Sequence, residues 1–237
     1  MADAQIEAAL GLAEAATGRL LDALADVDDA WCRAPSLLPD WSRGHVLTHL
    51  ARNADALARL ARATADGRAV SMYGPAGARE ADIEAGAGRD AATLVDDVRT
   101  SAARLSDTCR TVPDTVWDEV REWRPGRSQP LRTIPVARLV EAEAHRVDLG
   151  AGYVPADWPA SSCNLLLSTA LTRLAGAPSP PLLRVHPDGQ PPRGSDEPEA
   201  PTVSGPIHEL VWWLMGRDDG SRLSCTGPLP DLPAAWA

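Results

Sequence analysis

The sequence contains no lysine and no phenylalanine, and all 23 of its basic residues are arginine. Without a lysine amine, the chain cannot form a Schiff base through its own side chains. Acidic residues outnumber the arginines, and the formal net charge is −10. Nonspecific nucleic-acid binding needs a basic face, which this balance of charge does not favour. We therefore expect neither lysine-based covalent catalysis nor a nucleic-acid partner.

Cysteine and long apolar runs are also scarce. The four cysteines (Cys32, Cys109, Cys163 and Cys225) lie far apart and form no C-x-x-C pair. Their spacing argues against a zinc ribbon, a thioredoxin-type redox site and a disulfide scaffold, and it predicts free thiols with structural roles. No apolar run approaches the length of a membrane span, and Met1–Glu14 is acidic where a signal peptide would be basic. We expect a soluble, cytoplasmic protein with no membrane partner.

Helical patterns dominate the first two thirds of the chain. Apolar residues recur at helical spacing in residues 3–27, 43–66 and about 80–110. Ser42 has the properties of an N-cap for the second of these helices. A fourth helix opens at Thr133, with Pro135 in its first turn, and ends at Gly150. The stretch "WRPGRSQPLRT" before it reads as a connection, so the sequence predicts a four-helix bundle.

Composition changes after Tyr153, which predicts a second domain. The stretch "VPADWPA" reads as a linker, and residues 177–202 are rich in proline and polar side chains. Helices are expected at about 161–174 and in "PIHELVWWLMGR", with strands in "LLRVH" and "RLSCT". The predicted fold class is therefore α+β, with a helical bundle in residues 1–155 and a small α+β domain in residues 156–237.

Metal-ligating side chains recur at helical spacing in two of the predicted helices. Glu141 and His145 are at i,i+4, as are His45 and His49 in "HVLTH", so each pair lies on one helix face. Ligands from facing helices can converge in a bundle core, and two imidazoles with one carboxylate form a catalytic zinc set with an open fourth position. Such pairs also occur as solvated surface residues, and spacing alone leaves that alternative open.

Only one of the two histidines in "HVLTH" is needed for three protein ligands. His49 lies beside the buried stripe of its helix, whereas His45 is nearer the helix start. We therefore predict His49 as the ligand and His45 as a residue of the rim. Asp148, three residues after His145, either hydrogen-bonds within the ligand set or solvates the helix.

Four stretches of the chain carry a more specific signal. They are "DWSRGHVLTHLARNADAL", "SMYGPAGAREADIEAG", "RLVEAEAHRVDLGAGY" and "TVSGPIHELVWWLMGRDDGSRLSCTG". In this order, over nearly the whole chain, they resemble the mycothiol-dependent maleylpyruvate isomerase family. The resemblance implies a DinB-like metal-binding bundle followed by a small domain similar to sterol-carrier domains. It also implies zinc ligands at the second histidine of W-x-x-x-H-x-x-x-H and in E-x-x-x-H, which are His49, Glu141 and His145 here.

The resemblance implies an activity and two cofactors. Maleylpyruvate, a cis-enoic diacid from gentisate degradation, is converted to fumarylpyruvate with zinc and the small thiol mycothiol. Rotation about a C=C bond requires that the double bond be removed for a moment, which addition of a thiolate achieves. Zinc suits this chemistry because coordination deprotonates a thiol at neutral pH. The nucleophile then belongs to the cofactor, so no cysteine of the chain needs a catalytic setting.

A diacid substrate calls for fixed cations, and arginine binds carboxylates in a bidentate fork. The family has a functionally important arginine in its C-terminal G-R motif, which corresponds to Arg217, so we predict a catalytic and substrate-binding role for this residue. Arg79 and Tyr73 in "SMYGPAGARE" are further candidates for the substrate pocket. Structural alternatives stay open: a helix C-terminal cation for Arg217, a solvated loop charge for Arg79 and a simple anchor for Tyr73.

Two other functions compete with the isomerase. A mycothiol S-transferase would share the zinc–thiolate step and differ only in its acceptor. A non-enzymatic metal-binding regulatory bundle would need no cationic C-terminal motif. The stretches "MYGPAGARE" and "GRDDGSRL" favour the isomerase over both.

Overall fold

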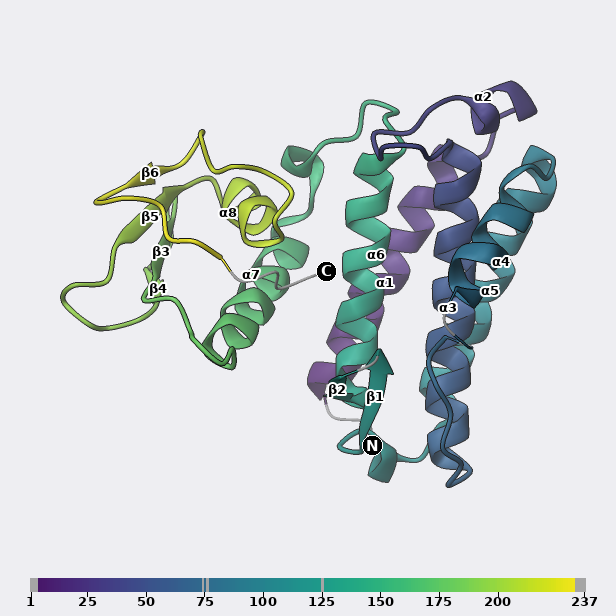
Figure 1. The fold of residues 1–237 in the computed structure, drawn as a ribbon, viewed down its shortest axis with the longest axis horizontal. Coiled ribbons are helices and arrows are strands. Elements are labelled where there is room, and N and C mark those ends of the chain that lie inside the picture. Colours follow the sequence, from purple (N-terminus) through teal and green to yellow (C-terminus); the bar gives the residue numbers. More distant parts are fainter. Residues whose placement is uncertain (1–3, 74, 76, 125, 233–237) are drawn as a thin grey trace. The chain divides into compact units, whose positions relative to one another are not determined.

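The structure, a computed structural model, describes residues 4–73, 75, 77–124 and 126–232. The chain divides into two compact units, and the division lies between Tyr153 and Val154. The first unit is helical apart from one hairpin, and the second combines helices with a small sheet (Figure 1). The α+β class predicted from the sequence is therefore correct. Within the described residues, no helix combines the length and the apolar character that a membrane span requires.

Four long helices form the bundle of the first unit. They are α1 (Ala4–Ala23), α3 (Arg43–Ala65), α5 (Ala91–Thr111) and α6 (Ile134–Asp148). Helix α3 packs against α5, and α1 packs against α6 (Figure 1). Shorter helices connect them: α2 (Asp29–Arg33), α4 (Ala78–Ala87) and the 3₁₀ turns Asp114–Val116 and Leu131–Thr133.

Side-chain caps fix the starts of three of these helices. Ser42 caps α3, as predicted, and its hydroxyl accepts a hydrogen bond from the His45 amide at 3.3 Å. Asp28 caps α2 and Asp90 caps α5 in the same way, which satisfies amide groups that have no partner inside a helix. Capping residues in the sequence therefore mark where α2, α3 and α5 begin.

The single helix expected over residues 80–110 is wrong, because the chain breaks between α4 and α5. Helix α4 ends at Ala87 and is followed by Gly88, and glycine has a poor helix propensity. Asp90 then accepts a hydrogen bond from the Thr93 amide at 2.8 Å and starts α5 as a new helix. The apolar periodicity runs through both segments and therefore hides the break.

The segment expected to be a plain connection forms a hairpin. Strand β1 (Val120–Arg124) pairs antiparallel with β2 (Arg127–Pro130). Gly126 supplies the positive φ of 74° that the turn needs, and its amide donates to Glu122 Oε1 at 2.8 Å. The sequence contains the proline–glycine pair typical of a turn, but the residues on either side lack the apolar alternation typical of strands, so the hairpin was not predicted.

Aliphatic side chains fill the bundle. The predicted stripe of α3 is fully buried, and the inward-facing residues predicted for the third helix are buried on α5. Full burial of each leucine or valine stabilises the unit by about 1.5–3 kcal/mol before the entropy of ordering is counted. The buried stripe of α3 comprises Val46, Leu47, Leu50, Leu57 and Leu60, and the stripe of α5 comprises Leu94, Val95, Val98 and Leu105.

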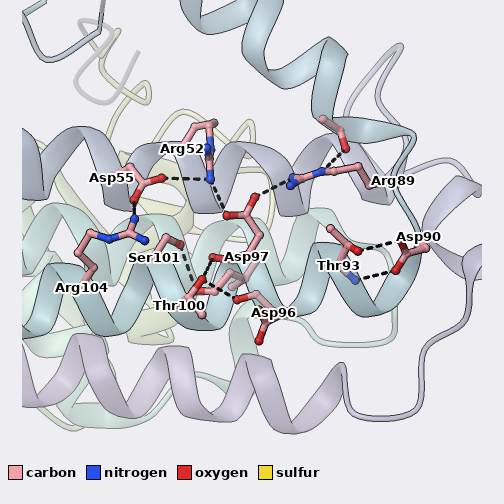
Figure 2. Close-up of polar contacts among 12 residues, drawn as sticks. Arg52, Asp55, Arg89, Asp90, Thr93, Asp96, Asp97, Thr100, Ser101 and Arg104 are labelled. Atoms are coloured by element: carbon pink, nitrogen blue, oxygen red, sulfur yellow. Dashed lines mark hydrogen bonds and ion pairs between the residues drawn. The ribbon is translucent and has the colours of Figure 1, made fainter.

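A row of ion pairs joins α3 and α5 (Figure 2). Asp97 lies between two guanidinium groups, 2.5 Å from Arg52 Nη2 and 2.7 Å from Arg89 Nη2. Arg52 also contacts Asp55 at 3.0 Å, and Asp55 pairs in turn with Arg104 of α5. These side chains are partly exposed, so each single pair adds little, but the row fixes α3 against α5.

The second unit holds a four-stranded sheet with the order β4-β3-β5-β6. Strand β3 (Arg184–Pro187) runs parallel to β5 (Thr202–Gly205), and β4 (Arg193–Gly194) and β6 (Ser224–Cys225) are antiparallel edges. Helices α7 (Ala160–Ala175) and α8 (Ile207–Leu214) pack together after the 3₁₀ turn Pro155–Asp157. Both expected helices and both expected strands are present. Strands β4 and β5 were not predicted, because they lie in or beside a proline-rich stretch of the sequence.

Candidate metal centre

Helices α3 and α6 bring the three predicted ligands together. His49 Nε2 lies 2.8 Å from Glu141 Oε2, and His145 Nε2 lies 3.1 Å from the same oxygen. One ligand atom from each of the three side chains lies within 4.8 Å of the others, and the two imidazole rings are 4.6 Å apart between centroids. The i,i+4 spacing on α6 supplies two of these groups, and packing of α3 on α6 supplies the third.

The centre is sheltered but not closed. The side chain of His49 is 4% exposed, that of His145 is 11% exposed and that of Glu141 is 19% exposed. All three groups are therefore largely buried, and Glu141 is the most accessible of them. Two imidazoles and one carboxylate within a few ångströms are a donor set that zinc uses in catalytic sites.

Burial and neighbouring charges set the protonation of the three groups. Burial lowers the pKa of His49 to about 4, although Glu141 beside it acts in the opposite direction. Burial alone would raise the pKa of Glu141, but His49 and His145 hold it well below its ordinary value. Burial would lower the pKa of His145, yet its hydrogen bonds to Asp148 and Glu141 raise it. At neutral pH, Glu141 is a carboxylate and His49 is neutral, which are the forms that bind a cation.

Asp148 orients the ring of His145. Its Oδ2 lies 2.8 Å from His145 Nδ1, and the residue is 3% exposed. With Nδ1 held by a carboxylate, Nε2 is the nitrogen that faces Glu141 and His49. The sequence left the role of Asp148 open, and this contact places its side chain against the ring of His145 and not on the solvated face of α6.

His45 takes no part in this cluster. Its Nδ1 accepts a hydrogen bond from the Ser42 amide at 3.1 Å, and its Nε2 lies 3.1 Å from Glu84 of α4. It therefore helps to cap α3 and to join α3 with α4. Trp41, the tryptophan of the W-x-x-x-H-x-x-x-H pattern, packs its ring against both His45 and His49 at centroid distances of 6.1 and 5.7 Å.

Arg79 and Tyr73, the further candidates for the substrate pocket, both lie beside the cluster. Arg79 Nη2 is 3.1 Å from His49 Nδ1, and its guanidinium carbon lies 5.6 Å from the centre of the Tyr73 ring. The Tyr73 hydroxyl accepts a hydrogen bond from Asn53 Nδ2 at 3.3 Å. A cavity of about 450 Å³ adjoins them, lined by Arg52, Asp55, Ala56, Arg59, Val70, Ser71, Tyr73, Ala78, Arg79 and Asp82.

Arg217 belongs to the second unit, where it follows the end of α8. Gly216 has a φ of 71°, and its amide donates to the Trp213 carbonyl at 2.8 Å. The amide of Arg217 donates to the Trp212 carbonyl at 3.2 Å, which completes a Schellman motif. The Arg217 guanidinium carbon lies 5.7 Å from the centre of the Trp212 ring. A turn with two backbone hydrogen bonds thus fixes where this side chain leaves the helix.

The cysteines stand apart from the histidine–glutamate cluster. All four are free thiols, as predicted, and three of them are buried. Burial raises the pKa of Cys109 to about 12, and burial together with nearby aspartates raises that of Cys32. Thiols with raised pKa values are poor nucleophiles at neutral pH. Within the part of the chain that the structure describes, the ligand cluster contains no cysteine.

The family model for the N-terminal domain of mycothiol maleylpyruvate isomerase matches residues 13–150, which is more than half of the chain. The chain belongs to the mycothiol maleylpyruvate isomerase family. It is also similar to a crystal structure of the mycothiol-dependent maleylpyruvate isomerase, with 27% identity, 96% of each chain covered and a TM-score of 0.78. A crystal structure of a histidine-to-alanine mutant of that isomerase matches with 26% identity, 96% of each chain and a TM-score of 0.77. A search of curated proteins found no match.

Membership of the mycothiol maleylpyruvate isomerase family confirms the resemblance that the sequence motifs indicated. The family is one of enzymes, so the chain is an enzyme, and the alternative of a non-enzymatic regulatory bundle loses its support. The solved structures cover both units of the chain and so also support the two-domain α+β fold class.

Proposed function

We propose that this enzyme is a zinc- and mycothiol-dependent cis–trans isomerase that converts maleylpyruvate to fumarylpyruvate by transient addition of the thiol to the double bond. The observation that carries the proposal is the convergence of His49, Glu141 and His145 in a chain whose solved relatives are isomerases of this name. A cytoplasmic location, small-molecule partners only and a domain boundary near residue 155 remain predictions within this proposal.

The three residues fit zinc by their chemistry. Two imidazole nitrogens and one carboxylate oxygen face one another, and the carboxylate oxygen already lies within hydrogen-bond distance of both rings. Zinc held by three protein ligands keeps a fourth position, where it would lower the pKa of a bound thiol. His49 and His145 would bind through Nε2, because Asp148 occupies Nδ1 of His145 and Glu141 faces Nε2 of His49.

The side chains around the centre would position the diacid substrate. Arg79 is a cation in direct contact with His49, and a guanidinium group matches a carboxylate in a bidentate fork. Tyr73, under the Arg79 guanidinium, would form one wall of the pocket and limit water. We further propose that Arg217 binds a substrate carboxylate and stabilises the negative charge that develops beside it during the reaction.

The direct experiment is a product assay with purified protein, zinc, mycothiol and maleylpyruvate. We expect fumarylpyruvate, with no product when the thiol is left out. His49→Ala and His145→Ala should lose both metal and activity, whereas the matched variant His45→Ala should keep most of both, since His45 contacts Ser42 and Glu84 instead. Full zinc occupancy in His145→Ala would show that the ligand assignment is wrong, and a stable thiol adduct as the product would indicate an S-transferase.

Arg217 is tested by kinetics and metal analysis on one sample. If Arg217 stabilises charge in the transition state, Arg217→Ala should lower the rate by about a hundredfold or more with zinc still bound. If it only caps α8, the change should cost about 0.3–1 kcal/mol of stability and leave turnover almost normal. Single Cys→Ser variants should all remain active when mycothiol is present, because the proposed nucleophile is external to the chain.

A further inference from the structure

Asn53 is a buried polar residue that the proposed reaction does not use. It lies on α3, four residues after His49, so the two side chains share one face of the helix. The residue is only 3% exposed, and burying an amide group costs free energy unless its donor and acceptor find partners. The partners of Asn53 are Arg138 of α6 and Tyr73 in the segment that follows α3.

The amide group of Asn53 has a fixed orientation. Its Oδ1 lies 3.5 Å from Nη1 of Arg138, and the same nitrogen donates to the carbonyl of Leu50 at 2.8 Å. Burial lowers the pKa of Arg138 to about 10, so at neutral pH the group is still a cation and offers donors only. An amide turned by 180° would place its NH₂ group against these donors. Oδ1 must therefore face Arg138, and Nδ2 must face the opposite way.

Nδ2 of Asn53 donates to the hydroxyl of Tyr73 at 3.3 Å. Residues 68–73 form neither helix nor strand, so no regular backbone pairing fixes the position of Tyr73. The residue before it is anchored, because Met72 is buried and its carbonyl accepts from Arg59 Nη2 at 2.5 Å. Met72 thus holds the backbone end of Tyr73, and Asn53 holds the ring at its hydroxyl end.

Tyr73 in turn supports Arg79. The guanidinium carbon of Arg79 lies 5.6 Å from the centre of the Tyr73 ring, and Nη2 of Arg79 lies 3.1 Å from Nδ1 of His49. A long arginine side chain loses rotamer freedom when it is held in one place, and contact with an aromatic ring offsets part of that cost. A chain of contacts therefore runs from Asn53 in the bundle core through Tyr73 to Arg79.

We propose that Asn53 is a positioning residue of the substrate pocket: through the hydroxyl of Tyr73, it holds the Tyr73 ring and the Arg79 guanidinium where they bind a carboxylate of the substrate. Asn53 itself does not touch the substrate. This inference rests on the substrate-binding role proposed above for Arg79 and Tyr73. It also explains why an amide is buried here, since an apolar side chain of similar size would need no hydrogen-bond partners.

The test is calorimetric titration of the zinc-loaded, full-length protein with maleate, a small cis-dicarboxylate that binds without a thiol. Asn53→Leu keeps a similar size and removes the polar atoms. We expect it to bind maleate about three- to tenfold more weakly, the effect of one hydrogen bond, with unchanged zinc content. The matched control is Thr64→Val, which also removes a buried polar group from α3 but loses only a contact with the carbonyl of Leu60. This control should bind maleate like the unmodified protein.

A double-mutant cycle separates a positioning role from a merely structural one. If Asn53 acts through the Tyr73 hydroxyl, Tyr73→Phe should weaken maleate binding by at least the same factor. Adding Asn53→Leu to Tyr73→Phe should then weaken binding further by less than about twofold, whereas independent effects on the bundle would multiply. In the isomerase assay, Asn53→Leu should raise KM and change kcat by less than about twofold, because the pocket holds substrate and transition state alike.

Three results would overturn the proposal. They are the absence of maleate binding to the unmodified protein, unchanged binding in folded Asn53→Leu, and multiplied factors in the cycle. Loss of zinc from Asn53→Leu would show that the residue supports His49 instead and would equally overturn it. Asn53→Ser, which keeps a polar atom but is too short to reach Tyr73, replaces Asn53→Leu if circular dichroism shows that the latter does not fold.

Failure of the proposed reaction would look different. An unmodified protein that binds maleate, depends on Asn53 for that binding and yet forms no fumarylpyruvate would refute the isomerase and support the pocket.

Discussion

Asp148→Asn should weaken zinc binding at the metal centre by about ten- to hundredfold, although Asp148 is not one of the three ligands. Its carboxylate lies 2.8 Å from Nδ1 of His145 and is almost fully buried. The negative charge makes the ring a stronger donor and holds Nε2 toward Glu141. Asparagine keeps the size of the side chain and removes the charge, so the change isolates that effect. The expected loss corresponds to about 1.4–2.7 kcal/mol of binding free energy.

The pH dependence of zinc affinity provides a second test with the same variant. His145 has a raised pKa, and a metal must displace its proton, so zinc affinity should fall about tenfold per pH unit below that pKa. Without the carboxylate of Asp148, the pKa of His145 falls, and the decline begins at lower pH. The difference in zinc affinity between the unmodified protein and Asp148→Asn should therefore be largest above the pKa of His145 and become smaller as the pH is lowered.

Competition with a chromophoric chelator at several pH values measures both effects. The matched control is Glu84→Gln, which removes a carboxylate 3.1 Å from the ring of His45, a histidine outside the ligand cluster. This control should change zinc affinity by less than about twofold. If folded Asp148→Asn binds zinc as tightly as the unmodified protein at every pH, Asp148 does not support His145, and the reasoning is wrong.

Three further substitutions test the contacts of Arg79 and the packing of two glycines. Arg79→Met should tighten zinc binding by about two- to tenfold. Arg79 donates a hydrogen bond to Nδ1 of His49, but Nδ1 must itself carry the proton once Nε2 binds a metal, so the two donors would then oppose each other. A fall in zinc affinity in the same chelator competition would refute this. Gly44→Ala should destabilise the protein by about 1–3 kcal/mol, since a Cβ there would lie 2.2 Å from the carbonyl oxygen of Ala87. Gly11→Ala, in an open position of α1, should instead stabilise it by about 0.5–1 kcal/mol; denaturant unfolding of the pair decides, and equal effects would contradict the packing argument.

The parts of the fold that follow a local rule could be predicted from the sequence. The long helices, the Ser42 cap and the burial of the α3 stripe depend on periodicity and on hydrogen bonds within a few residues. The spacing of Glu141 and His145 is also a local feature, because a separation of four residues places two side chains on one face of a helix. The choice of His49 over His45 used only the position of the buried stripe.

The features that the sequence did not reveal depend on contacts between distant segments. Arg79 approaches His49 from thirty positions along the chain, and no local pattern encodes that contact. The contact of Asn53 with Tyr73 joins residues twenty positions apart and is likewise invisible in the sequence. The break between α4 and α5 at Gly88 could not be predicted from the apolar pattern for another reason. Helical periodicity continues through a short break, so the capping residue Asp90 is the signal that marks it.

The contacts of α3 on its two sides have a consequence for the alignment of the ligands. Each residue of an α-helix advances the axis by about 1.5 Å, so a slip of α3 by a single residue would carry His49 out of reach of the pair on α6. Leu50 directly follows His49, and its carbonyl accepts a hydrogen bond from Arg138 of α6. Arg52, three residues after His49, forms an ion pair with Asp97 of α5. These two contacts hold the axial register of α3 at the level of His49, so residues outside the cluster of His49, Glu141 and His145 help to set the geometry of the candidate metal centre.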